Sequence, residues 1–201
     1  MIKSLLISAA LMGASIGAAN ASTVVFNDNF ESDSEVLNAT LNNWTVTNGS
    51  VDVIGQASYP WYSSGKQIDM NGSTGTTGRI ETSALTLQVG KAYKLSFGYG
   101  YNKNSGAYEQ MSFGVGSATG VVGPALIGSV APPTLNTYSF VFKANAVSAS
   151  IFFADDDVSP GDWGGPVLDN VVLAAVPVPA AAPLLLGALG GLAMLRRRRR
   201  A

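Results

Sequence analysis

Cysteine and histidine are both absent from this chain of 201 residues. Without cysteine it can form neither a disulfide framework nor a catalytic thiolate. Without histidine it contains no Ser-His-Asp or Cys-His arrangement and no histidine ligands for a zinc enzyme. The remaining enzyme hypothesis is a glycosidase with two carboxyl groups about 5–9 Å apart, supplied by Glu81 or Glu109 with an aspartate. The 13 acidic residues are scattered, so we expect solvated carboxylates and no enzyme.

Basic residues are scarce between the two ends of the chain. Apart from Lys3 and five arginines at the C-terminus, only six of the 12 lysines and arginines remain, against all 13 acidic residues. The central part of the chain, residues 22–175, therefore carries a formal charge of about −7. A surface of this sign repels phosphate-rich partners, so no nucleic acid is expected to bind.

Amphipathic helix patterns are also missing from residues 22–175, where short β-rich runs alternate with Gly, Asn, Ser and Pro. In residues 92–100 and 136–143 aromatic side chains recur at every second position, which is typical of strands with one buried face. Asn48-Gly49 predicts a tight hairpin between two of the runs. We expect one all-β domain, a two-sheet β-sandwich. The predicted strands cover residues 23–26, 44–47, 51–54, 66–70, 78–82, 92–100, 110–116, 136–143, 148–154 and 167–173.

The N-terminus has the three parts of a secretory signal peptide. Lys3 precedes an apolar stretch, and Ala19-Asn20-Ala21 is a small-x-small cleavage site. The apolar stretch is short for a membrane span, which needs about 20 residues. We predict a signal peptide over residues 1–21, cleavage between Ala21 and Ser22, and export of the mature chain.

The C-terminus combines a proline motif, an apolar run and a basic end. The apolar run, residues 180–195, has 16 residues and would form about 24 Å of helix, against a hydrocarbon core of about 30 Å. Such a run is a marginal anchor, which flanking arginines can hold across a membrane with the basic end in the cytoplasm. The predicted stop-transfer residues are Arg196, Arg197, Arg198, Arg199 and Arg200.

This C-terminal arrangement resembles the VPLPA-CTERM form of the PEP-CTERM sorting signals of Gram-negative bacteria. The resemblance covers residues 176–201 and departs from the motif in one position, where valine replaces leucine. It implies removal of the tail by an exosortase-type enzyme and delivery of the protein to the cell surface or extracellular matrix. The motif residues are Val176, Pro177, Val178, Pro179 and Ala180.

The central part resembles galactose-binding-like jelly-roll domains, which include several carbohydrate-binding modules. "FNDNFES", with Trp44 a short loop later, matches the opening of such domains, and "GPVLDNVVL" matches their last strand. The resemblance implies a jelly-roll sandwich over residues 22–175. It also implies a structural calcium ion held by Glu31 and Asp169 with backbone carbonyls, a donor set that calcium accepts without histidine.

Aromatic residues beside turn signals are the candidate ligand contacts, because exposed rings can stack on a sugar face. These candidates are Trp61, Tyr62, Tyr101 and Trp163. We expect an exported, non-catalytic domain that associates with extracellular polysaccharide. Two alternatives stay open at this stage: a structural or adhesive matrix protein with a protein partner, and the carboxylate-pair glycosidase.

Overall fold

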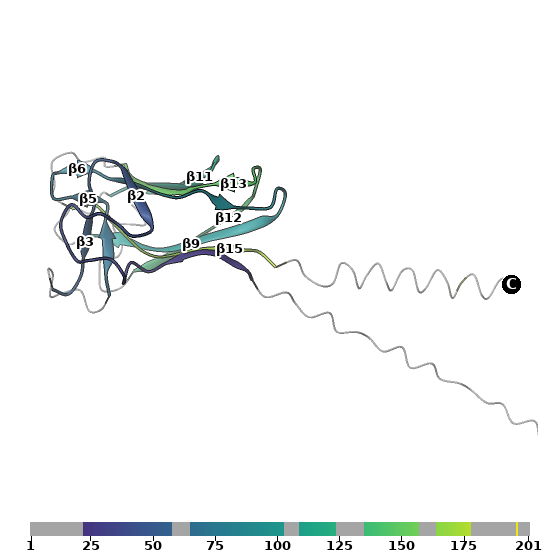
Figure 1. Ribbon diagram of the computed structural model, residues 1–201, viewed down its shortest axis with the longest axis horizontal. Coiled ribbons are helices and arrows are strands. Elements are labelled where there is room, and N and C mark those ends of the chain that lie inside the picture. The colour runs from purple at the N-terminus through teal and green to yellow at the C-terminus, as the bar shows by residue number, and fades with distance from the viewer. Residues whose placement is uncertain are drawn as a thin grey trace, which may run out of the picture. The chain divides into compact units, whose positions relative to one another are not determined.

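The computed structural model describes residues 22–57, 65–102, 109–123, 135–156, 164–177 and Arg196. Ser22–Val176 forms one compact unit, and its described secondary structure consists of β-strands alone (Figure 1). Among the described residues there is no helix of the length and apolarity that a membrane crossing requires. The predicted signal peptide and the apolar run before Arg196 lie outside the described residues.

The strands follow the chain in this order: β1 (Val24–Asp28), β2 (Trp44–Asn48), β3 (Asp52–Ile54), β4 (Gln67–Asp69), β5 (Asn71–Gly72), β6 (Thr76–Thr77), β7 (Arg79–Thr82), β8 (Leu85–Thr86), β9 (Ala92–Tyr101), β10 (Met111–Val115), β11 (Ala118–Val122), β12 (Asn136–Lys143), β13 (Ser148–Ala149), β14 (Ile151–Asp155) and β15 (Pro166–Ala175).

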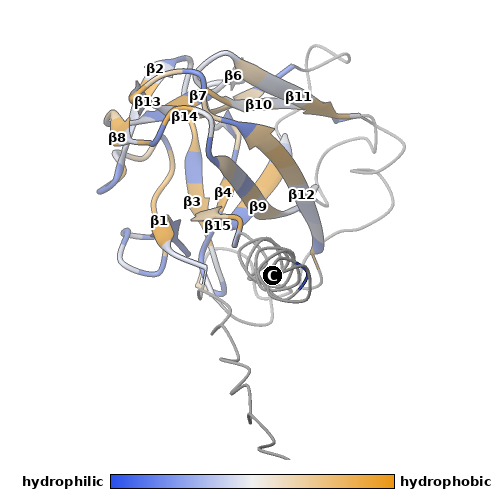
Figure 2. Ribbon diagram, turned by 90° about the vertical axis from the view of Figure 1, so that its right-hand side faces the viewer, coloured by the Kyte–Doolittle hydropathy of each residue, from blue (hydrophilic) through white to orange (hydrophobic). Residues whose placement is uncertain are grey.

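Two antiparallel sheets form the layers of a jelly-roll β-sandwich. One sheet has the order β12-β9-β15-β4-β3, with β1 also paired to β15, and the other has the order β11-β10-β14-β7-β2. In Figure 2 the sheet with β14, β10 and β11 lies above the sheet with β15, β9 and β12. Neighbours in these sheets are mostly distant in sequence. The long strands β9 and β15 pair over most of their length and form the centre of the first sheet.

The core lies between the two sheets and is rich in aromatic rings. Phe97 of β9 meets Phe113 of β10 and Phe153 of β14 edge to face, at centroid distances of 5.0 and 4.8 Å. All three side chains are fully buried. Each such burial stabilises the fold by about 1.5–3 kcal/mol. The alternation predicted for residues 92–100 and 136–143 is confirmed, because their aromatic side chains face this core.

All ten predicted runs contain strands, but the predicted hairpin at Asn48-Gly49 is wrong. Gly49 does turn the chain, at φ 55°. The flanking strands then separate, since β2 pairs with β7 in one sheet and β3 pairs with β4 in the other. The side chains of β3 explain this path: all three are buried, and Val53 belongs to the core between the sheets.

Candidate functional site

The chain turns sharply after β1, in a segment that we call the acidic turn, Asp28–Asp33. The Phe30 N–H donates to Asp28 Oδ1 at 2.9 Å, and the Asp33 N–H donates to the Phe30 carbonyl at 3.1 Å. Lys66, just before β4, donates its Nζ to the carbonyls of Glu31 and Asp33 at 2.9 and 2.5 Å. Its N–H donates to Glu31 Oε1 at 2.8 Å. The turn is thus fastened to the first sheet by a lysine.

Asp169 approaches the same turn from β15. It lies at a bulge in the pairing of β15 with β9, where Asn170 adopts φ 50° and donates its N–H and Nδ2 to the Asp169 carboxylate. Burial, with a smaller effect from the charges of Glu31 and Asp28, raises the pKa of Asp169 to about 7, although the Asn170 N–H acts in the opposite direction. The two residues predicted as calcium ligands therefore lie close enough to repel each other.

The donor set of this region fits calcium in part. Carboxylate oxygens are hard ligands of the kind calcium prefers, and a cation would relieve the repulsion that Glu31 and Asp28 exert on Asp169. The Glu31 and Asp33 carbonyls, however, already hold the Lys66 ammonium. Within the described ranges no group of three or more acidic side chains is arranged to hold a metal ion. The residues that could hold calcium here are Glu31 and Asp169, with backbone carbonyls other than those of Glu31 and Asp33.

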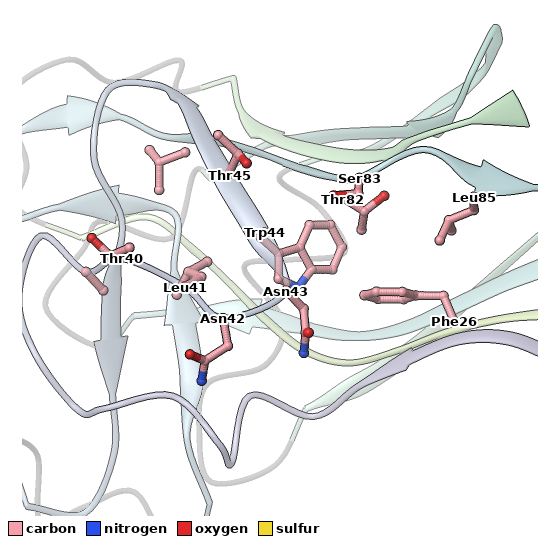
Figure 3. A pocket seen from close by; sticks show the side chains of 12 residues that line it. Phe26, Thr40, Leu41, Asn42, Asn43, Trp44, Thr45, Thr82, Ser83 and Leu85 are labelled. Atoms are coloured by element: carbon pink, nitrogen blue, oxygen red, sulfur yellow. The ribbon is translucent and has the colours of Figure 1, made fainter.

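A pocket of about 650 Å³ opens beside the acidic turn, between β1, the segment 39–46, β7 and β8 (Figure 3). Its described lining contains no charged side chain. Half of the lining residues are neutral and polar: Thr40, Asn42, Asn43, Thr45, Thr82 and Ser83. The other half is apolar: Phe26, Ala39, Leu41, Trp44, Val46 and Leu85.

Asp28 fixes one wall of this pocket. Its Oδ2 accepts hydrogen bonds from Trp44 Nε1 at 2.9 Å and from Asn43 Nδ2 at 3.2 Å. The Trp44 ring also packs edge to face on Phe26, with centroids 5.3 Å apart, and is tilted against Phe153 at 5.9 Å. The sequence did not indicate this pocket. The signal that could have pointed to it is the density of Thr and Asn around one tryptophan in "ATLNNWTVT".

The structure describes only one of the four predicted ligand-contact aromatics. Trp61, Tyr62 and Trp163 lie outside the described residues. Tyr101 was predicted beside a turn, but it is the last residue of β9, pairs with Pro166 and packs partly buried against the core. Tyr101 therefore belongs to a strand and not to a loop, because the β9–β15 ladder continues to the end of the aromatic run.

A buried carboxyl network, which the sequence did not reveal, lies on β4. Asp69 is 1% exposed and accepts hydrogen bonds from the backbone N–H groups of Asn71 and Gly165 and from Asn102 Nδ2, at 3.0, 2.8 and 2.6 Å. Burial raises the pKa of Asp69 to about 7 against these three donors, and Asp52 on the neighbouring strand adds a smaller effect in the same direction. The free energy of unfolding is therefore expected to change with pH as this carboxyl group ionises.

The glycosidase hypothesis depended on Glu81 or Glu109. The Glu81 carboxylate forms an ion pair with Arg79, with Oε1 at 2.7 Å from Nη2, and also accepts a hydrogen bond from Arg79 Nε. Glu109 is 1% exposed. A paired carboxylate and a buried one are poorly suited to protonate a glycosidic oxygen in an open cleft, so the structure does not favour this alternative.

No family model matches this chain, and no curated protein matches it. Solved structures do match. The CBM22-1 xylan-binding domain of Xyn10C from Paenibacillus barcinonensis aligns with a TM-score of 0.52 and 15% identity, over 80% of this chain and 99% of that domain. The CBM22-1-CBM22-2 tandem domain of the same protein aligns with a TM-score of 0.51 and 14% identity, over 80% of this chain and 48% of the tandem. A CBM35 from the same organism gives a TM-score of 0.43. The first two matches establish the jelly-roll fold.

Proposed function

We propose that the protein is an exported, non-catalytic domain that associates with polysaccharide. The observation that carries this proposal is that the described sandwich has the fold of a xylan-binding domain over nearly the whole of that domain. The charge of the central part, about −7, and the lack of histidine and cysteine are further support. A protein of this composition recognises an uncharged polymer through aromatic faces, hydroxyls and amides.

The predicted aromatics Trp61, Tyr62, Tyr101 and Trp163 are proposed to contact the glycan. We expect Trp61→Ala and Trp163→Ala each to weaken retention on the bound polysaccharide by more than about tenfold, which corresponds to about 1.4 kcal/mol. Affinity electrophoresis in gels containing the polysaccharide measures this change, and thermal unfolding shows that the variants remain folded. Loss of stability without loss of retention would place both tryptophans in the core and remove them from the site.

The C-terminal tail is proposed to be a sorting signal for an exosortase-type enzyme, which the precursor meets in the inner membrane. In the native host, we expect intact-mass analysis of the surface protein to give a start at Ser22 and an end before Arg196. If the mature surface form retained the five terminal arginines, the tail would instead be a simple membrane anchor. Replacing these arginines with serine is expected to reduce membrane retention of the precursor, since positive charges orient the segment.

Calcium is proposed as a structural ion bound by Glu31 and Asp169. Calcium at about a hundredfold excess over its dissociation constant should then stabilise Ser22–Val176 by about 2.7 kcal/mol. Differential scanning calorimetry with and without chelator measures the effect, and Glu31→Ala or Asp169→Ala should abolish it. Half-buried Glu35→Ala is the matched control, in which the response is retained. An identical melt with calcium and with chelator excludes the site.

A further inference from the structure

We propose that the pocket between β1, residues 39–46, β7 and β8 is a binding site for an uncharged sugar residue. The proposal rests on the proposed function, because it assumes a glycan ligand, but it assigns a site that the sequence did not suggest. The pocket volume, about 650 Å³, lies in the range of about 300–1,000 Å³ that small-molecule sites occupy.

The lining has the two kinds of surface that a sugar presents. Half-buried Phe26 and Leu85, with buried Leu41 and Trp44 beside them, give an apolar wall for the C–H face of a pyranose ring. Around this wall lie exposed hydroxyl and amide side chains, among them Thr40, Asn42 and Thr45 (Figure 3). Hydroxyls and amides can both donate and accept, as the alternating hydroxyl groups of a sugar require.

Several of these polar groups are available to a ligand. Among the described residues, the hydroxyls of Thr40, Thr45 and Ser83 make no hydrogen bond to protein. The side-chain amides of Asn42 and Asn43 are oriented through their nitrogens: Asn42 Nδ2 donates to the carbonyl and the hydroxyl of Ser32, and Asn43 Nδ2 donates to Asp28. The side-chain Oδ1 atoms of these two asparagines remain as acceptors at the pocket. Such fixed amides bind with less loss of side-chain entropy than mobile ones.

The charge distribution selects an uncharged sugar. The described lining holds no lysine or arginine to pair with a uronate or sulfate group. The Asp28 carboxyl group lies directly behind Trp44 and Asn43, and the central part of the chain carries about −7 in total. An anionic sugar would therefore be repelled. A cationic amino sugar gains little, because Asp28 is 5% exposed and already accepts three hydrogen bonds.

The test is an NMR titration of Ser22–Val176 with xylohexaose, cellohexaose and mannohexaose as uncharged probes and hexagalacturonate as the anionic probe. The signals to follow are the side-chain amides of Asn42 and Asn43 and the indole N–H of Trp44. We expect at least one uncharged probe to shift these signals. We expect hexagalacturonate to bind at least about fivefold more weakly than that probe.

Two strand positions provide a blocking variant and its matched control. Thr45 and Thr47 are both exposed threonines on β2, and only Thr45 belongs to the described lining. Thr45→Tyr should fill the pocket and weaken binding of the uncharged probe by about tenfold or more, whereas Thr47→Tyr should leave that binding unchanged. Ser83→Tyr, at the lining residue that follows β7, repeats the test should Thr45→Tyr fail to fold. Ser83→Lys should improve binding of hexagalacturonate.

The outcomes separate this proposal from the proposed function. An uncharged probe could bind without shifting the three pocket signals and bind the Thr45→Tyr variant as tightly as the parent protein. That result would overturn the pocket site but leave glycan association standing. Equal or tighter binding of hexagalacturonate at the pocket overturns the proposed selectivity of the pocket for uncharged sugars. If none of the probes and no polysaccharide binds the protein, the pocket site and the proposed function both fail.

Discussion

Asp28→Ala is expected to lower the free energy of unfolding of Ser22–Val176 by about 2–3 kcal/mol. Asp28 is 5% exposed and accepts hydrogen bonds from the Phe30 N–H, Trp44 Nε1 and Asn43 Nδ2. Removing the carboxylate leaves the first two donors buried without a partner, at about 1–3 kcal/mol each. Relief of the repulsion between Asp28 and Asp169 offsets part of this loss.

Urea unfolding measures this change, and Asn29→Ala is its control. Asn29 is exposed, and within the described part of the chain its side chain makes one long hydrogen bond, accepting at Oδ1 from the Glu31 N–H at 3.4 Å. The control should change the free energy of unfolding by less than about 0.5 kcal/mol. A loss below about 1 kcal/mol for Asp28→Ala would mean that Asp28 does not organise the turn and the pocket wall.

The second large effect is a loss of stability as the pH rises from 4 to 7. Burial raises the pKa of Asp69 from 3.8 to about 7 in the folded state. The folded protein therefore binds a proton more tightly than the unfolded chain does. The stabilisation from this group is complete below about pH 4 and is lost as the pH rises through 7, by up to about 4 kcal/mol.

Asp69→Asn isolates this contribution, because Asp169 also has a raised pKa and adds a slope of the same sign. The asparagine keeps an oxygen for the Asn71 and Gly165 N–H groups, and the Asn102 amide can rotate to accept from its nitrogen. Urea unfolding from pH 4 to pH 8 should show the variant equal to the parent at pH 4 and more stable at pH 8. Parallel profiles for the two proteins would show that Asp69 ionises normally in the fold.

Strand positions could be predicted from the sequence because they depend on local alternation. The run at residues 92–100 needed only the period of two and its bounding glycines to be recognised as a strand, and it became β9. Short strands with small residues carry no such signal, and β11, with the sequence ATGVV, was missed for that reason. The hairpin error has a different cause. Asn48-Gly49 specifies a turn but does not specify which sheet receives the next strand, since that depends on side-chain burial far along the chain.

The residues of the candidate site could be predicted from the sequence only where they belong to a recognisable motif. The approach of Asp169 to the acidic turn follows from pairing of the first and last strands, which the resemblance to jelly-roll domains supplied. Lys66 could not be foreseen as the partner of the Glu31 and Asp33 carbonyls, because a lysine 33 residues from Asp33 has no sequence pattern that marks it. The pocket was missed because three stretches that are distant in sequence build it, Phe26, residues 39–46 and residues 82–85, and no sequence pattern shows that they meet.

A binding assay of Ser22–Val176 on polysaccharides decides whether the protein is a non-catalytic, polysaccharide-associated domain. Purified protein should be depleted from solution by at least one insoluble uncharged polysaccharide, such as xylan, cellulose or mannan, and released by the matching soluble oligosaccharide. Chromatography should find the polysaccharide chains uncut. No depletion by any uncharged or anionic polysaccharide would contradict the account, and release of shortened chains would replace binding with catalysis.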